Sequence, residues 1–318
     1  MSDKTWNVNH IPAQTGKTII ITGATSGIGF EAALALAAAG AEVVIASRNP
    51  SKGAAILSKI RQICPDARVN FMILDTSSQA SVRSFCDSWL SLHKKIDTLI
   101  LNAGISNVPS REETVDGFER QLATNYLGHF AMTARLLPSM NGSADARIIP
   151  VSSLAHKRTH LHFDDLQLKR HYNPMLAYNQ SKLAVLTFAL ELSRRLKHQG
   201  PPIKVIPVHP GVAATDITRG GDRMNPVIQR LAKALFGLVG QSASQGAWSL
   251  LYAATSDDVQ SGTFYGPGGP GERRGIPAPA QIAPQAADID NGRRLWNLTE
   301  KLLEISFLSL SADSDISI

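Results

Sequence analysis

The sequence predicts an α/β fold in which a doubly wound parallel sheet forms a single domain. From Lys17 onward, short β-branched runs alternate with longer segments rich in alanine and leucine. Most of the short runs are continuously apolar, which is typical of strands that helices cover on both faces. With 318 residues, of which 43% are hydrophobic and 18% charged, the chain can bury one large core.

Each element follows from this alternation. Six strands are expected over residues 18–21, 42–46, 69–74, 98–101, 147–151 and 204–208. Helices are expected over residues 28–39, 51–63, 78–92, 118–137, 177–197, 242–254 and 293–307. The last helix carries a stripe of leucine and isoleucine that we expect to face the core rather than a membrane.

Segments outside the alternation divide the chain. Residues 1–16 form an N-terminal extension, residues 17–265 the core domain, and residues 266–318 a C-terminal loop, helix and flexible tail. Within the domain, residues 156–174 and 218–240 are insertions, and insertions near strand ends are where open α/β sheets build binding sites. The stretch after Tyr265 is rich in glycine and proline, shows no core pattern and is expected to be a loop.

Composition excludes several classes of protein. Subtracting 26 acidic from 32 basic residues leaves +6, and no run of Lys and Arg forms a nucleic-acid-binding patch. Cys64 and Cys86 are too few for a disulfide framework. The N-terminus lacks the apolar core of a secretory signal and no apolar run reaches 18 residues, so we expect a cytoplasmic protein without a transmembrane segment.

Four histidines lie in the first insertion, at His156, His160, His162 and His171. Acidic or cysteine companions at ligand spacing are not evident. We therefore expect a solvated substrate loop and no metal site.

A glycine-rich turn follows the first strand and opens the first helix, which is the context of a phosphate-binding turn. Gly23 can make the tight turn, Gly27 can let the backbone approach an anion, and Gly29 can let helix and strand pack closely. Amides at the helix start, in the segment Thr25-Ser26-Gly27-Ile28, can face that anion. The alternative is a tight connection without a ligand.

Tyr178 and Lys182 are four residues apart in a helical segment, so their side chains project from one face. A free tyrosine has a pKa near 10, and a neighbouring ammonium lowers the pKa toward a useful range for an acid/base catalyst. Such a pair alone is a weak signal, because surface pairs share the spacing.

Together these motifs resemble the short-chain dehydrogenase/reductase family, whose fold is a Rossmann-type sheet. The resemblance rests on the spacing Gly-x-x-x-Gly-x-Gly, covers nearly all of residues 17–265, and is strongest to members similar to retinol dehydrogenases and WW-domain oxidoreductases. The segments that carry this closer likeness are Ser47-Arg48-Asn49, Ser152-Ser153-Leu154-Ala155-His156 and Ala177-Tyr178-Asn179-Gln180-Ser181-Lys182.

The resemblance implies roles for further residues. Ser153 would orient the substrate carbonyl, with Ser152 as the adjacent alternative, and Asn125 would hold a proton-relay water next to Lys182. The implied cofactor contacts are Asp75, the segment Asn102-Ala103-Gly104, Pro210, Gly211 and Thr215, beside the glycine turn, Tyr178 and Lys182. From chemistry alone, Asn102 can equally serve a structural role at the strand end.

The cofactor is expected to be NADP(H). NAD-binding chains usually carry Asp or Glu at the end of the second strand, whereas this chain has Ser47-Arg48. Arg48 can pair with a 2′-phosphate and Lys52 can add charge one helical turn later. The alternative is a solvated arginine.

The sequence therefore predicts an NADP(H)-dependent oxidoreductase acting on the carbonyl or alcohol carbon of a hydrophobic small molecule. Tyr178 is the acid/base, Lys182 lowers its pKa, and Ser153 orients the carbonyl. The alternatives are a reductase of carbon–carbon double bonds on the same scaffold, and a non-catalytic NADP-sensing or scaffold protein. The resemblance also implies a homodimer through the helices predicted over residues 118–137 and 177–197.

Overall fold

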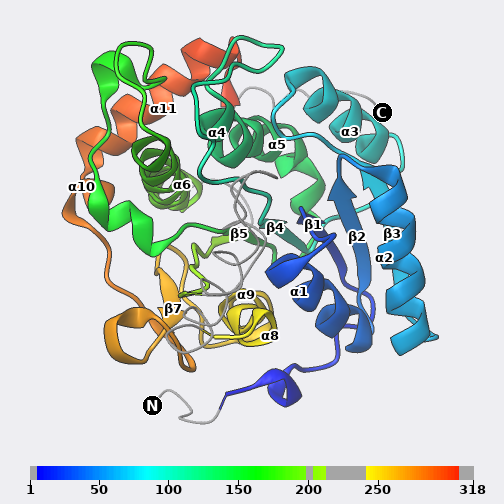
Figure 1. The fold of residues 1–318 in the computed structure, drawn as a ribbon. Helices are drawn as coiled ribbons and strands as arrows, with labels where there is room; N and C mark the ends of the chain where they lie inside the picture. The colour runs from blue at the N-terminus through cyan, green and yellow to red at the C-terminus, as the bar shows by residue number, and fades with distance from the viewer. Residues whose placement is uncertain (1–5, 198–202, 213–240, 308–318) are drawn as a thin grey trace, which may run out of the picture.

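A six-stranded parallel sheet forms the centre of the protein, as the sequence predicts (Figure 1). The computed structural model describes residues 6–197, 203–212 and 241–307. The strand order β3-β2-β1-β4-β5-β6 reverses direction between β1 and β4, as in a doubly wound sheet. The strands are β1 (Thr18–Thr22), β2 (Glu42–Ser47), β3 (Arg68–Ile73), β4 (Thr98–Leu101), β5 (Arg147–Pro150) and β6 (Lys204–Val205).

Strand β6 is shorter than the predicted 204–208. Its regular pairing with β5 ends at Val205, because Pro150 of β5 has no N–H to donate to the facing strand, although Ile206 and Val208 still donate to the carbonyls of Ile148 and Pro150. Val208 rejoins the sheet through isolated bridges to Val151 and Tyr265.

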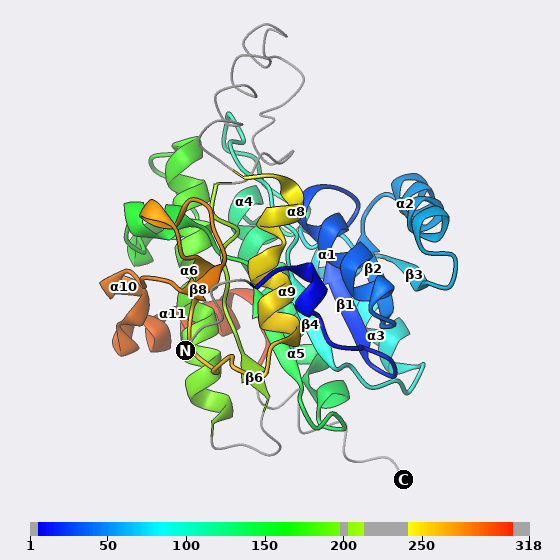
Figure 2. The ribbon, with the colours of Figure 1, turned by 90° about the horizontal axis from the view of Figure 1, so that it is seen from below.

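Helices cover both faces of the sheet. Ile19 and Ile21 of β1 face one core, shared with α1 (Gly27–Ala38), α2 (Pro50–Ile63) and α9 (Trp248–Thr255), and the short α8 (Ala243–Gly246) packs against α1. Figure 2 shows α8 and α9 beside α1. Ile20 faces the other core, with α3 (Gln79–Leu90), α5 (Gly128–Leu136), α6 (Pro174–Leu196) and α11 (Ile289–Leu303). No helix in the described part of the chain is both long and apolar enough to cross a membrane.

Short polar side chains set where these helices begin. Asn49, Ser78, Asn173 and Asp288 each accept hydrogen bonds from amides of the first turn. The cap at Asp288 makes α11 begin four residues before the predicted 293, and Glu304, in the left-handed conformation with φ 53°, ends it.

The predicted helix over 118–137 is interrupted. It begins only at α4 (Arg120–Leu122), because Glu119 caps it through its carboxylate, and continues through a π-helical turn (Ala123–Leu127) into α5. Gly128 starts α5 so close to the loop after β3 that a Cβ there would overlap the carbonyl oxygen of Thr76. The predicted helix over 242–254 is likewise two pieces, α8 and α9.

The glycine- and proline-rich stretch after Tyr265 is structured, which corrects the expectation of a loop. Strands β7 (Tyr265–Pro267) and β8 (Pro277–Pro279) pair antiparallel, and α10 (Pro284–Ala287) follows. The hairpin lacks the alternation of an ordinary strand pair, since four of its six paired residues are proline or glycine and every pair contains at least one of them. The predicted tail after Phe307 lies outside the described residues.

An aromatic cluster joins α11 to the rest of the protein. Trp296 and Phe307 pack against Phe130 of α5 and Phe188 of α6, with ring centres 4.6 to 6.2 Å apart. Figure 1 shows α11 alongside α6. The homodimer through α5 and α6 stays a prediction, but α11 already covers part of the surface that it would use.

Replacing Trp296 with alanine is expected to lower the free energy of unfolding by about 3–5 kcal/mol, because the substitution leaves a cavity in this cluster. Urea denaturation measures the change. Lys301→Ala, at an exposed position of the same helix, is the control and should alter stability by less than about 0.5 kcal/mol. Equal unfolding midpoints for Trp296→Ala and wild type would contradict this account of the cluster.

Candidate active site

The predicted site residues gather at one edge of the sheet. Gly23, Arg48, Asn102 and Ser153 follow β1, β2, β4 and β5 respectively. Because these strands are parallel, their carboxyl ends meet at the same edge, on both sides of the point where the strand order reverses.

The turn after β1 has the conformation that its glycines permit. Gly23 and Gly27 have φ values of +69° and +57°, and a Cβ at Gly29 would lie 2.5 Å from Nδ2 of Asn102. Ser26 stands at the N-cap of α1 but makes no side-chain capping bond, so amides of the first turn keep their hydrogens for another acceptor. The turn therefore fits a pyrophosphate.

Asn102 and Thr22 bind the turn to the end of β4. Asn102 Nδ2 donates to the carbonyl oxygens of Thr22 (2.9 Å) and Gly23 (3.3 Å). The Thr22 hydroxyl accepts from the amides of Asn102 and Ala103, both at 2.9 Å. Asn102 thus has the structural role that its chemistry allows, at a position beside the predicted cofactor.

Two basic side chains after β2 are exposed and available to a ligand. Arg48 and Lys52 are exposed, and among the described residues neither side-chain cation has a hydrogen-bond or ion-pair partner. Asp75, after β3, is half-buried, and its Oδ1 accepts from the amide and the hydroxyl of Ser77. The arrangement fits a ligand with a phosphate near Arg48.

Lys182 lies deep in the site, on the inner side of α6. It is 3% exposed, its Nζ donates to the carbonyl oxygen of Val151 at 3.0 Å, and it lies 6.0 Å from the centre of the Tyr178 ring. A Cβ at Gly104 would lie 3.3 Å from Nζ, so the loop after β4 also borders the ammonium.

The two serines after β5 have different surroundings in the structure. Ser152 is buried and its hydroxyl donates to the main-chain carbonyl of Lys182 at 2.7 Å. Ser153 is half-buried, and its hydroxyl lies close enough to the Tyr178 phenol to lower the pKa of that group. Ser153, and not Ser152, therefore shares with Tyr178 a point where one substrate oxygen could contact both hydroxyls.

Burial shifts the pKa values of both predicted catalytic groups. Desolvation raises the pKa of the Tyr178 phenol, and the interaction with Ser153 opposes that rise. Desolvation lowers the pKa of Lys182 to about 8. The apolar surroundings thus disfavour the charged form of each group, whereas the sequence predicts only the effect of the lysine on the tyrosine.

The side chain of Asn125 is fully used in holding the loop after β4. Its Oδ1 accepts from the amide of Ile105, and its Nδ2 donates to the Ile105 carbonyl and the Ser181 hydroxyl. Asn125 lies in the π turn, and its own carbonyl accepts from Nδ1 of His129 at 3.0 Å. Asn125 thus stands next to Gly104, with Oδ1 3.3 Å from the position of a Cβ there, and its amide group is committed to protein partners.

Sequence reasoning missed several polar residues of this region. His129 is buried, its Nε2 contacts the Thr22 hydroxyl at 2.9 Å, and burial lowers its pKa to about 4. His156, expected to be solvated, is fully buried; Nδ1 donates to the Ser153 carbonyl and Nε2 accepts from the amide of Ala283. Neither histidine follows an apolar period that would mark it as buried.

Two of the predicted cofactor contacts after β6, Pro210 and Gly211, belong to the part of the chain that the structure describes. Gly211 has a φ of +66°. The carbonyl of Pro210 accepts from Nε2 of Gln241 at 2.7 Å. Thr215 and the insertion over 218–240 lie outside the described residues.

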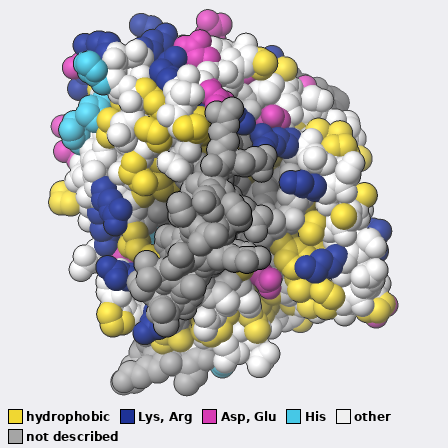
Figure 3. All heavy atoms as spheres, in the orientation of Figure 1, with side chains coloured by type: hydrophobic (Ala, Val, Ile, Leu, Met, Phe, Trp, Pro, Cys, Tyr) yellow, Lys and Arg dark blue, Asp and Glu magenta, His cyan; other side chains and the backbone are white. Residues whose placement is uncertain are grey.

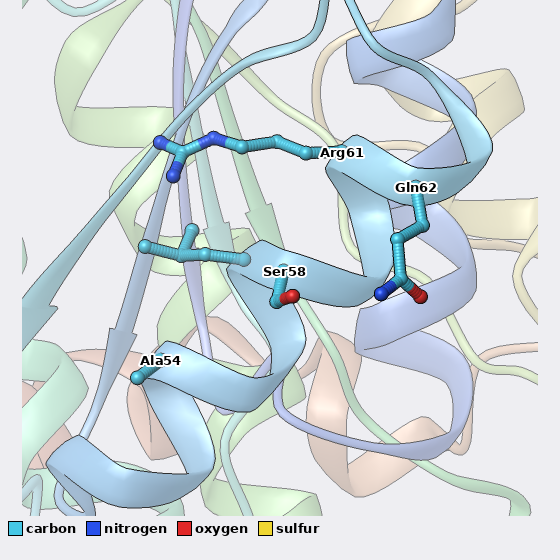
Figure 4. Close-up of a pocket in the computed structure, with 5 residues that line it drawn as sticks. Ala54, Ser58, Arg61 and Gln62 are labelled. Atoms are coloured by element: carbon cyan, nitrogen blue, oxygen red, sulfur yellow. The ribbon is translucent and has the colours of Figure 1, made fainter.

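Two hollows lie apart from this edge. One, of about 500 Å³, is lined by His160, His162, His171, Arg170 and Arg294 among others, and histidines gather beside lysines and arginines at the upper left of Figure 3. The other is a shallow hollow of about 430 Å³ along α2, lined by Ala54, Leu57, Ser58, Arg61 and Gln62 (Figure 4). Across the described ranges, no group of three or more His, Cys, Asp or Glu could hold a metal ion.

Comparisons with known proteins agree with the fold and the motif order. A family model described as short chain dehydrogenase matches residues 17–225. Retinol dehydrogenase 12 of Mus musculus is 37% identical over 294 residues, which cover 92% of this chain and 88% of that protein. Polyprenol dehydrogenase of Mus musculus is 38% identical over 293 residues, which cover 90% and 83%.

Solved structures show the same architecture. The crystal structure of an uncharacterized protein from Mycobacterium paratuberculosis has a TM-score of 0.77 and 36% identity, covering 95% of this chain and 98% of that one. Levodione reductase has a TM-score of 0.64 over 79% of this chain and 95% of its own, and at 21% identity it supports the fold alone.

The pKa of Lys182 leads to a prediction about stability. An unfolded lysine has a pKa of 10.5 and the folded one about 8, so the folded state binds fewer protons between these values. The free energy of unfolding should therefore rise by up to about 3 kcal/mol between pH 8 and 10.5, and the corresponding penalty is fully present at pH 7. In Lys182→Met that rise should disappear and the protein should be more stable near neutral pH, as thermal unfolding without cofactor can measure. Parallel pH profiles for the two proteins would contradict the depressed pKa.

Proposed function

This chain belongs to the short-chain dehydrogenase family, and on that premise we propose that it is an NADP(H)-dependent oxidoreductase acting on a carbonyl or alcohol carbon. Membership makes it a dehydrogenase or reductase. The observation that carries the finer proposal is the proximity of the Ser153 and Tyr178 hydroxyls, with the buried ammonium of Lys182 on the same helix and 6.0 Å from the centre of the Tyr178 ring.

The nicotinamide supplies or accepts the hydride, and the residues of the chain manage the oxygen and its proton. In the direction of reduction, Tyr178 donates its proton to the substrate oxygen as negative charge develops there. Ser153 donates a second hydrogen bond to that oxygen and so favours the transition state over the ground state. We assign to Lys182 the stabilisation of the phenolate that remains. The interaction with Ser153 opposes the rise in pKa that burial causes at Tyr178.

The free cations after β2 support NADP(H) over NAD(H). Arg48 has planar geometry suited to a 2′-phosphate, and no carboxylate stands at the end of β2 to bind a ribose hydroxyl instead. Lys52 lies in the first turn of α2, so its charge adds to the same region.

The names of two relatives suggest the substrate class. Proteins named for retinol and polyprenol act, by those names, on apolar alcohols. We therefore propose that the substrate of this chain is an apolar alcohol or the corresponding carbonyl compound.

Tyr178→Phe and Ser153→Ala are each expected to lower kcat by at least about 100-fold, since each removes one hydroxyl from the substrate oxygen. Consumption of NADPH at 340 nm against aldehydes, ketones and enones measures this. Tyr252→Phe removes a hydroxyl from α9, outside the site, and should keep kcat within twofold.

The same panel separates the rival functions. Turnover of enones but not of aldehydes or ketones would indicate a reductase of carbon–carbon double bonds. NADPH binding without turnover across the panel would indicate a non-catalytic protein.

Arg48→Asp is expected to lower the ratio of kcat/KM for NADPH over NADH by about 100-fold, because the carboxylate repels a 2′-phosphate and can bind a ribose hydroxyl. Arg61→Asp, on the outer part of α2, is a charge-matched control that should leave the ratio unchanged. An unaltered ratio in Arg48→Asp would refute the assignment of the 2′-phosphate to this arginine.

A further inference from the structure

The hairpin that the sequence did not predict touches both loops of the active-site edge. Its connecting loop contains a short 3₁₀ turn (Pro270–Glu272), and Glu272 has a φ of +56°, a conformation that glutamate rarely adopts. This segment lies beside β7 at the lower left of Figure 1. Its backbone reaches the turn after β6, where the Arg273 carbonyl accepts from the amide of Val212 at 2.9 Å.

The carboxylate of Glu272 joins three segments. Its Oε1 accepts from the amide of Gln281 at 2.8 Å, and its Oε2 accepts from Nζ of Lys157 at 2.9 Å. The same Oε2 lies 3.4 Å from Nε2 of His209, close enough for an electrostatic interaction but without the geometry of a hydrogen bond. These contacts hold the pKa of Glu272 down, at about 2, so the group is an anion at neutral pH. Glu272 therefore presents negative charge to the loop after β5 and to the residue before Pro210.

The hydrogen bonds of His209 fix which of its nitrogens carries the proton. The amide of Gly211 lies 3.1 Å from Nδ1 and can only donate, so Nδ1 is the acceptor. The imidazole is fully buried and burial lowers its pKa, which favours the neutral ring. The single ring proton is then on Nε2, on the side of Glu272.

The His209 ring is closely packed on two sides. A Cβ at Gly266 would overlap Nε2, and the ring of Phe264 lies with its centre 5.1 Å away. Gly211 is equally confined, since a Cβ there would overlap the Arg273 carbonyl oxygen. These contacts restrict movement of the ring, so a change at the carboxylate acts mainly on the tautomer of His209.

We propose that Glu272 is a positioning residue that selects the tautomer of His209 and thereby holds the Pro210–Gly211 turn in the conformation that binds the nicotinamide half of the cofactor. This inference rests on the proposed function and on the family resemblance, which implies that the Pro210–Gly211 segment holds the nicotinamide. The negative charge of the carboxylate, 3.4 Å from Nε2, favours the tautomer with its proton on Nε2 and leaves Nδ1 free for the Gly211 amide, as second-layer carboxylates orient histidines in other sites.

Glu272→Gln reverses this arrangement with little change in shape. If Oε1 keeps its bond from Gln281, the new amide group directs its hydrogens toward Lys157 and His209, where donor meets donor. His209 then has to accept at Nε2 and carry its proton on Nδ1, opposite the Gly211 amide. The turn loses its hydrogen bond, so we expect the Kd for NADPH, measured by isothermal titration calorimetry, to rise about tenfold.

A fragment of the cofactor separates positioning from general damage. Adenosine 2′,5′-bisphosphate lacks the nicotinamide half and should bind wild type and Glu272→Gln with Kd values within twofold. Glu42→Gln removes a carboxylate paired with Lys94 at the opposite edge of the sheet and should change neither Kd. Equal losses for NADPH and the fragment in Glu272→Gln would mean a structural defect and would overturn the proposal.

A second variant tests the tautomer itself. His209→Asn supplies a carbonyl acceptor near the former Nδ1 that carries no ring proton to relocate, so adding Glu272→Gln to it should change the Kd for NADPH by less than twofold. A further tenfold loss in the double variant would show that Glu272 does not act through His209. Wild type that binds neither NADPH nor the fragment would instead refute the proposed function, so the two failures are distinguishable.

Discussion

A buried histidine that stays neutral links the parts of the active-site edge. The Thr22 hydroxyl accepts from two amides of the loop after β4, so its own proton is directed to Nε2 of His129. His129 can then donate from Nδ1 to the carbonyl of Asn125. Because burial lowers the pKa of His129 to about 4, this chain of hydrogen bonds persists at neutral pH. The glycine turn, the loop after β4 and the π turn are thereby held in one fixed relation.

Near these hydrogen bonds, the proposed catalytic site contains features that lower the stability of the folded protein. Lys182 and Tyr178 lie in surroundings that disfavour their charged forms, although charge on both groups is what acid/base work requires. The π turn at Asn125 is a further departure from regular structure, and it brings a polar side chain to the loop at Ile105. The large cores on both faces of the sheet compensate for these local costs.

The sequence predicts what depends on local pattern and less of what depends on distant contacts. The six strands, the glycine turn and the position of Tyr178 and Lys182 on one helix follow from periodicity and spacing. The choice between Ser152 and Ser153 could not be settled from chemistry alone, because both follow β5 and only the packing of α6 distinguishes them. The role of Glu272 depends on the hairpin after Tyr265, and that of His156 on Ala283, which follows the hairpin. The prolines and glycines of the hairpin leave its strands without a periodic pattern.

The aromatic cluster under α11 also bears on how the chain acquires its structure during synthesis. Phe130 and Phe188 leave the ribosome well before Trp296 and Phe307, which later cover them. Until then the nascent chain exposes aromatic surface on the helix that carries Tyr178 and Lys182, the kind of surface that chaperones bind and that promotes aggregation. Completion of the fold at this helix is thus a late event, even though the sheet beneath it is encoded mostly in the first half of the chain.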